Sequence, residues 1–432
     1  MENIQPDKGF IVKSKSKRVS MRDTPMPVAL LLISFCLPTE LFFNVGGLNL
    51  TMTKIVLLVL SVFLIIRRSP IKKYAHDYAL IGFVLWLFLS LIIHHGFLTA
   101  IKSGGLSLLE ILVSYFTARY FIKKPSHIYG VTNLLVFLAM LLLPFLVIEN
   151  FTGVHIFHEL ASSVTGIYYP FKDEARFGLI RATGPFSHPI LLGVFFSAIL
   201  GLFWYSSRSM LKPKVLKSIT LIAATFTTLS SAPVLVIMVQ FFIVFWNKYA
   251  AFIRYRWKII FISMVCMYVF LLFYSDRSPL MAILSRITVD SQTSYYRILI
   301  WEYGIQNIIN NPVFGLGFND WVRIDWMVSD TVDSFWLLQT MRYGVPAIIF
   351  LSWSIFSLMR KVNELKDLKQ LSEYKLLSMG WLVTMISFIL IGFTVDFFGS
   401  NMPYFFFIFG LGAAIFKMQV AANITYKNDQ RN

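Results

Sequence analysis

The chain has 432 residues, of which 57% are hydrophobic and only 14% are charged, and its mean hydropathy is +0.68. This composition excludes an ordinary soluble globular domain. The net charge of +17 is spread over short segments between apolar stretches, so it indicates membrane topology rather than a surface that binds nucleic acid.

The apolar stretches are mostly long enough to cross the roughly 30 Å of a bilayer's hydrocarbon core. They predict an all-α polytopic membrane protein with about 12 transmembrane helices. The first stretch follows a basic tail but contains Pro38 and lacks a small-x-small cleavage pattern, so we expect a retained span rather than a signal peptide. The predicted spans are 26–43, 48–66, 78–97, 104–122, 128–148, 189–206, 216–230, 232–247, 258–275, 334–358, 376–397 and 402–418.

The connecting segments alternate between rich and poor in Lys and Arg, and 29 of the 39 basic residues fall in the rich ones. The positive-inside rule places these segments in the cytoplasm. We therefore expect a multi-pass protein of the bacterial cytoplasmic membrane with both termini cytoplasmic. The expected division is a cytoplasmic tail at 1–25, a transmembrane domain at 26–418 and a second cytoplasmic tail at 419–432.

Two predicted outer connections are long, at about 149–188 and 276–333, and are rich in aromatic residues, Gly, Pro and Asn. We expect them to be folded and functional. Six of the eight basic residues in the outer connections are Arg, whereas 19 of the 29 inner ones are Lys. A guanidinium pairs bidentately with phosphate or carboxylate. The alternative is that these residues pair with acids of the same loops; they are Arg176, Arg181, Arg277, Arg286, Arg297 and Arg323.

The first motif is Arg181-Ala-Thr-Gly184-Pro-Phe-Ser-His188-Pro189, directly before the span at 189–206. The Gly-Pro pair predicts a tight turn, and Pro189 suits the first turn of a helix. Ser187 or His188 is expected to cap that helix. Its amino end beside Arg181 would suit an anion, although a cap without further function fits the same pattern.

The second motif begins at Arg297 on an amphipathic stretch that contains Trp301. Asn310-Asn-Pro-Val-Phe-Gly315-Leu-Gly317 follows, and Asp333-Ser334 precedes the next span. The outer segments contain no HExxH, DxD or Cys/His cluster, and Cys36 and Cys266 lie in apolar stretches. We therefore expect no metal site, no cofactor and no disulfide.

Ionisable residues inside the predicted spans are few. Lys54 and Arg342 lie near enough to an interface to extend their side chains to water, and Asp396 lies near a span end. Glu110 is more deeply placed, and it is a functional residue or pairs with Lys54 across helices.

Together the two motifs resemble the R-x-x-G-x-F-x-x-P and R…W…P-x-x-G-x-G signatures of the bacterial O-antigen polymerase and O-antigen ligase superfamily. The resemblance covers roughly residues 180–350. It implies a GT-C-like membrane glycosyltransferase that acts on undecaprenyl-diphosphate-linked glycans at the outer face of the cytoplasmic membrane. Further partners implied are membrane lipids, a flippase and a chain-length regulator.

The sequence departs from the family pattern in two places. The turn after the seventh span reads Leu229-Ser-Ser-Ala-Pro233, where the family usually has Leu-Ser-Arg-Gly. Asp333 stands where the ligases usually carry His. This second departure favours a polymerase of O-antigen, capsule or exopolysaccharide repeat units over a ligase.

The resemblance and the charges together suggest roles for individual residues. Arg181 and Arg297 are expected to bind the donor diphosphate and act in catalysis, with Asp333 as the general base. Further candidates for diphosphate binding are Arg286, Arg323 and His188. Two alternatives remain open, namely a ligase-type transfer to a lipid or protein acceptor and a flippase for lipid-linked oligosaccharides.

Overall fold

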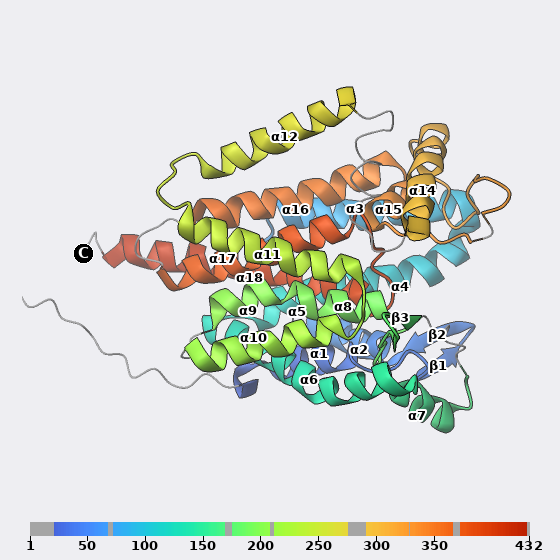
Figure 1. Ribbon diagram of the computed structural model, residues 1–432, viewed down its shortest axis with the longest axis horizontal. Coiled ribbons are helices and arrows are strands. Elements are labelled where there is room, and N and C mark those ends of the chain that lie inside the picture. Colours follow the sequence, from blue (N-terminus) through green and yellow to red (C-terminus); the bar gives the residue numbers. More distant parts are fainter. Residues whose placement is uncertain are drawn as a thin grey trace, which may run out of the picture.

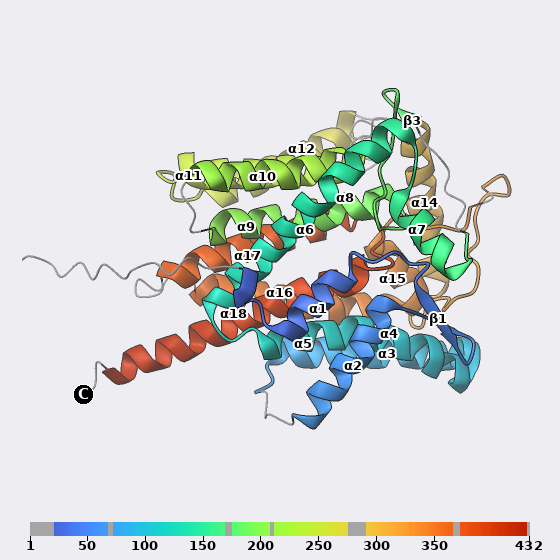
Figure 2. The same cartoon turned by 90° about the horizontal axis from the view of Figure 1, so that it is seen from below.

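The computed structural model describes residues 21–67, 72–168, 175–207, 211–274, 291–327, 329–365 and 372–429. Within them the chain is almost entirely helical, and most helices run along one direction in a bundle (Figure 1). The all-α polytopic membrane fold predicted from the sequence is confirmed. Short helices and strands gather at the end of the bundle away from the carboxyl terminus, which we call the loop end (Figures 1 and 2).

The first half of the chain contains a 3-10 turn (Met21–Asp23), α1 (Met26–Ser34), β1 (Phe42–Val45), β2 (Leu48–Thr51), α2 (Met52–Ile66), α3 (Ala75–Thr99), the π-helical turn η2 (Ala100–Gly104), α4 (Gly105–Leu108), the π-helical turn η3 (Leu109–Val113), α5 (Ser114–Phe121), α6 (Pro125–Thr152), α7 (Ile156–Thr165), β3 (Ala175–Arg176), β4 (Leu179–Ile180), α8 (Pro189–Ala198) and α9 (Leu200–Ser206). The second half contains α10 (Leu211–Phe226), α11 (Ser231–Tyr249), α12 (Arg256–Tyr274), α14 (Ser291–Asn310), α15 (Phe335–Tyr343), α16 (Val345–Leu365), α17 (Ser372–Ile391) and α18 (Asn401–Asp429).

Within the described ranges, 7 helical segments are long and apolar enough to cross a membrane. One of them, Ala75–Phe121, covers the two predicted spans 78–97 and 104–122. Gly96, at φ 77°, interrupts the helical backbone between these two spans. The first predicted span is shorter than expected: α1 ends at Ser34, before Pro38, and an antiparallel β1–β2 hairpin follows. At the other end of the chain α18 continues to Asp429, past the predicted end of the membrane domain at 418.

Five aromatic residues of α18 are fully buried in the apolar core, namely Tyr404, Phe405, Phe406, Phe407 and Phe409. Tyr404 stacks at a tilt on Phe195, with ring centroids 4.4 Å apart, and meets Phe35 edge-on at 5.9 Å. Trp381 of α17 donates a 2.8 Å hydrogen bond from its indole nitrogen to the carbonyl of Ile408. A Cβ on Gly412 would overlap the Trp381 ring, so glycine lets these two helices approach closely.

Two charge pairs lie among the helices. Arg119 pairs with Asp77, which also accepts a 2.7 Å hydrogen bond from the Tyr115 hydroxyl, and this cluster is buried. Lys54 of α2 lies 3.9 Å from the carboxylate of Glu110, which is one of the two alternatives that the sequence left open for Glu110. Pairing reduces the large cost of placing a charge in an apolar environment.

The predicted span at 334–358 is broken at Gly344, which has φ 81° and separates α15 from α16. The break is filled by the loop that follows α14. Leu316 and Gly317 donate backbone N–H groups to the carbonyls of Met341 and Arg342, both at 2.8 Å, and Val345 donates to Pro312 at 2.8 Å. The carbonyls freed by the break are therefore satisfied by protein rather than water.

Glycine is required where this loop docks. Gly315 and Gly317 have φ 65° and φ 63°, and a Cβ on Gly315 would fall on the carbonyl oxygen of Met341. A Cβ on Gly317 would lie 2.6 Å from the ring nitrogen Nε2 of His95. From α3, the Ser90 hydroxyl donates to the Phe314 carbonyl at 2.6 Å. The Gly-x-Gly sequence is thus explained by close backbone approach.

The close packing of the 312–317 loop predicts that one added methyl group at Gly315 destabilises the protein. Gly315→Ala should lower the free energy of unfolding by about 2 kcal/mol or more, because a left-handed backbone and overlap with Met341 both oppose the side chain. Thermal unfolding of the purified protein in detergent measures this. Gly105→Ala is the matched control, since Gly105 is helical and a Cβ there meets nothing within 4 Å. Equal melting of the two variants would contradict the assignment.

Candidate functional site

A cavity of about 400 Å³ opens at the loop end of the bundle. It is lined by the start of α8, the segment before α15, the end of α15 and the connection between α17 and α18. Its polar side chains include three carboxylates and one guanidinium from distant parts of the chain. They are His188, Asp330, Thr331, Asp333, Arg342, Thr394 and Asp396.

Backbone hydrogen bonds bring Asp333 and Asp396 to the same cavity. Ser334 is fully buried, caps α15 by accepting from the Leu337 amide, and donates its hydroxyl to the Gly392 carbonyl at 3.1 Å. The amide of Phe335 donates to the Val395 carbonyl at 3.2 Å. The Asp333-Ser334 pair therefore combines a residue facing the cavity with one that holds the wall in place.

The charge of an arginine acts on each of Asp333 and Asp396. Burial raises the pKa of Asp396 to about 6, against the opposing effect of Arg342. Asp333 is accessible from the cavity mouth but is otherwise surrounded by protein, and this desolvation raises its pKa, against the opposing effect of Arg297. Two carboxyl groups that titrate closer to neutrality than usual are suited to accept a proton from a substrate.

Arg297 is buried near one end of α14, 6% exposed. The residues after it, Leu299 and Ile300, pack with Trp321 and Leu337 in a small apolar core beneath the loop. Desolvation lowers the pKa of Arg297, and the positive charge of Arg176 acts in the same direction. Its Nε atom is buried and has no hydrogen-bond acceptor among the described residues.

Arg181 and Arg176 both donate to the turn between α10 and α11. Arg181 is 4% exposed and donates from Nε to the Thr228 carbonyl at 3.2 Å and from a terminal nitrogen to the Ser230 hydroxyl at 2.7 Å. Arg176 donates to the Leu229 carbonyl at 3.0 Å. Leu229 itself has φ 46°, a left-handed conformation unusual for leucine. Two arginines thus converge on the turn where the family pattern has its own arginine.

The segment around Gly184 is held by the buried carboxylate of Glu149. Its Oε1 accepts from the Thr183 amide at 2.8 Å and from the Thr183 hydroxyl at 2.7 Å, and its Oε2 accepts from the Gly184 amide at 3.0 Å. His155 also lies against this carboxylate, with Nδ1 2.5 Å from Oε1. Glu149 is one of the acids of the 149–188 connection that were considered as partners for the loop arginines, and the structure shows that it accepts from backbone amides.

A second acid–histidine pair supports the same segment. His158 of α7 places Nδ1 2.6 Å from Oε1 of Glu40, and its Nε2 lies 3.1 Å from the Phe186 carbonyl. Phe186 is itself 3% exposed. Glu149 and His158 therefore both hold the chain between Arg181 and Pro189 in place.

His188 caps α8, as the sequence suggested for Ser187 or His188. Its Nδ1 accepts from the Ile190 amide at 3.2 Å, and its carbonyl accepts from the Leu191 amide at 3.1 Å. Pro189 has no amide hydrogen. The first-turn amides at this helix end are thus occupied within the protein rather than presented to an anion. The His188 side chain nevertheless lines the cavity.

The other predicted arginines are placed differently. Arg323 pairs with Asp320, donates from Nε to the Met327 carbonyl at 2.8 Å and lies over the Trp321 ring, so it stabilises its own loop. Arg286 lies outside the described residues, as does Arg277. Among the predicted site residues, the structure brings His188 and Asp333 into one cavity, with Arg297 acting electrostatically on Asp333.

Two cavity residues were seen in the sequence but not assigned to a site. Arg342 was attributed to the membrane interface, because a single long span hid the break at Gly344. Asp396 was placed near the end of a span, whereas α17 ends at Ile391 and leaves it in a connection. The sequence did carry a signal for both residues. Arg342 lies near the start of one apolar stretch, and Asp396 lies near the end of the next.

Residues 216–352 match the family model described as O-antigen ligase. This range runs from α10 to α16 and contains Arg297, Asp333 and Arg342. The match supports membership of the chain in the O-antigen ligase and polymerase superfamily. Its function is therefore of the O-antigen ligase or polymerase type, and it is a glycosyltransferase-like membrane enzyme. No curated protein matches the sequence.

The Glu149 contacts predict local loosening in Glu149→Gln. An amide nitrogen cannot accept from a backbone N–H, so at least one charge-assisted hydrogen bond is lost, and the amides of Thr183 and Gly184 should exchange about tenfold faster or more. Hydrogen–deuterium exchange of the peptide covering 181–188 measures this. Glu159→Gln, on the exposed face of α7, should leave exchange in 181–188 unaltered. Unchanged protection in Glu149→Gln would show that the carboxylate is not the main anchor.

Proposed function

We propose that the protein polymerises undecaprenyl-diphosphate-linked oligosaccharide repeat units into O-antigen, capsular polysaccharide or exopolysaccharide at the outer face of the bacterial cytoplasmic membrane. The observation that carries this proposal is the Asp333 carboxylate in the lining of a cavity, with the buried guanidinium of Arg297 close enough to act on its charge. A glycosyl transfer from a lipid diphosphate needs both, because a hydroxyl must lose its proton while a diphosphate leaves.

The donor diphosphate would bind at Arg297 and Arg181, with Arg176 between them. Arg176 acts on the charge of Arg297 and shares the 228–230 turn with Arg181. The glycosidic bond between the donor sugar and the diphosphate breaks, and the bonding electrons leave with undecaprenyl diphosphate. Preplaced guanidinium groups stabilise the negative charge that grows on the leaving oxygen, so this chemistry proceeds without a metal ion or cofactor.

The acceptor would be the non-reducing end of a second lipid-linked repeat unit, lying in the cavity. Its hydroxyl oxygen forms the new bond to the donor sugar and gives its proton to the Asp333 carboxylate. Arg342, Asp396 and His188 line the same space and offer donors and acceptors for sugar hydroxyls. Asp333 at the position where the ligases usually carry His favours polymerase over ligase.

Loss of one diphosphate-binding arginine should reduce polymerisation by about 10²–10³-fold, the usual effect of removing one charge-stabilising donor. Arg297→Ala and Arg181→Ala should therefore leave single repeat units on a gel where the parent protein makes a ladder, and Arg181→Lys should restore activity only in part. Lys102→Ala is the control, because it removes an exposed positive charge at the loop end outside the site. A full ladder from well-expressed Arg297→Ala would refute the assignment.

The pH dependence should identify the base. Activity requires ionised Asp333, so it should fall as the pH drops through a pKa above the ordinary value for aspartate. Asp333→Asn should lower kcat by about 10² or more at every pH. Asp396→Asn should lower kcat less than Asp333→Asn does. It should also shift the acid limb of the pH–activity profile to lower pH, because the repulsion between the two carboxylates is gone. If Asp396→Asn were inactive and Asp333→Asn were active, Asp396 rather than Asp333 would be the general base.

A reconstituted system separates the alternatives. In proteoliposomes with lipid-linked repeat units on the accessible face, a polymerase lengthens the glycan and releases undecaprenyl diphosphate. A flippase does neither. A ligase transfers glycan only when its lipid or protein acceptor is added, so extension in the absence of such an acceptor is the result expected here.

A further inference from the structure

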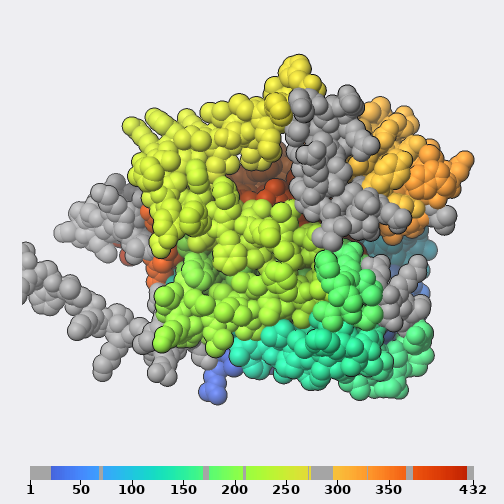
Figure 3. Space-filling model, in the orientation of Figure 1, coloured from blue at the N-terminus to red at the C-terminus, as the bar shows by residue number. Residues whose placement is uncertain are grey.

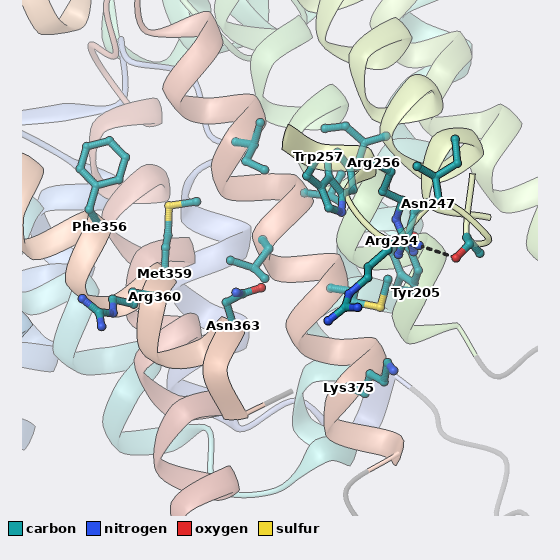
Figure 4. Close-up of a pocket in the computed structure, with 17 residues that line it drawn as sticks. Tyr205, Asn247, Arg254, Arg256, Trp257, Phe356, Met359, Arg360, Asn363 and Lys375 are labelled. Atoms are coloured by element: carbon teal, nitrogen blue, oxygen red, sulfur yellow. Dashed lines mark hydrogen bonds between the residues drawn. The ribbon is translucent and has the colours of Figure 1, made fainter. Parts of the chain in front are cut away.

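A second and larger cavity lies at the opposite end of the bundle from the Asp333 site. It has a volume of about 1010 Å³ and lies between the α11–α12 connection and the helices α16 and α17 (Figure 4). In the space-filling view, orange-red atoms are visible at the bottom of a hollow beside the yellow α12 (Figure 3). The Asp333 mechanism makes no use of this cleft.

The cleft is open toward the side because α12 stands away from the bundle (Figure 1). None of the α12 side chains that the structure describes is buried, although the helix is apolar along most of its length. Trp257 of α12 and Phe356 of α16 are 46% and 59% exposed, and both line the cleft. Met359 and Ile386 continue this apolar wall. In a membrane, such a surface meets hydrocarbon chains.

The end of the cleft farther from the loop end is basic. Its 17 lining residues contain four cationic side chains and no Asp or Glu; the cations are Arg254, Arg256, Arg360 and Lys375. Arg256 is oriented by a 2.9 Å hydrogen bond to the side-chain oxygen of Asn247 (Figure 4). Arg360 pairs at 2.8 Å with Glu364 on the exposed side of α16. Without the charge of Arg360, three cationic side chains remain in the lining, so its net charge is still positive.

We propose that this cleft binds an anionic phospholipid. The headgroup phosphate lies among Arg254, Arg256 and Lys375, and the acyl chains lie between α12 and α16 against Trp257 and Phe356. Basic pockets between transmembrane helices, open sideways to lipid, suit this kind of ligand. The phosphate-binding end of the cleft is opposite the Asp333 cavity, so the bound lipid belongs to the other leaflet from the donor diphosphate. A polyprenyl phosphate donor is therefore not the expected occupant.

The proposal is tested with phospholipids brominated on their acyl chains, which quench nearby tryptophan. The full-length protein in mixed micelles should be quenched more by brominated phosphatidylglycerol than by brominated phosphatidylcholine at the same mole fraction. Trp257→Phe should remove this difference. Arg254→Gln combined with Lys375→Gln should weaken the preference for phosphatidylglycerol about tenfold or more. Both side chains are exposed, so the double variant should fold.

The matched control is Lys123→Gln combined with Lys124→Gln, which removes two exposed charges from another basic connection away from the cleft. It should retain the preference for phosphatidylglycerol. Equal quenching by both lipids, or an equal loss in the control, would overturn the proposal. Displacement of brominated phosphatidylglycerol by undecaprenyl phosphate at lower concentration than by unlabelled phosphatidylglycerol would assign the cleft to isoprenoid lipids instead. None of these outcomes bears on the polymerase assignment, which depends on the other end of the bundle.

Discussion

The arrangement of the loop end depends on backbone hydrogen bonds that replace water at a broken helix. Where α15 ends at Gly344, its last carbonyls would be costly to leave unpaired beside hydrocarbon. The 312–317 loop satisfies them, and only glycine permits the approach at positions 315 and 317. Because α15 then ends at the cavity, Arg342 lies beside Asp396 instead of inside a long span.

The arginines at the loop end illustrate how a positive cluster is kept in place before a ligand arrives. Arg176 and Arg181 donate to the peptide carbonyls and hydroxyl of the 228–230 turn, and these neutral acceptors orient the two guanidinium groups. Arg323, in contrast, is neutralised by Asp320. Partial negative charges on carbonyls hold a guanidinium more weakly than a carboxylate does, and the diphosphate binding that we propose requires such weaker holding.

The sequence predicted the fold class well, because long apolar stretches and the Lys/Arg distribution follow directly from the membrane environment. It also placed Arg181, His188, Arg297 and Asp333 on or beside the two long outer connections, and the structure brings two of them, His188 and Asp333, into one cavity. It did not predict the break at Gly344, because apolar residues flank it on both sides and hydropathy does not record a positive φ. Nor did it show that Glu149 binds amides of residues 183 and 184, since that contact joins the end of α6 to a turn 34 residues later. Such pairings depend on packing between distant segments.

The turn at 228–230 has a consequence for how this enzyme and its relatives can diverge. It connects α10 to α11, yet its carbonyls hold arginines from the β3–β4 region. An exchange of the 175–188 segment between relatives, without the matching turn, would leave donors and acceptors mismatched inside the protein. The two segments are thus expected to change through linked substitutions, and chimeric proteins built by swapping one loop alone should be inactive even when each parent is active.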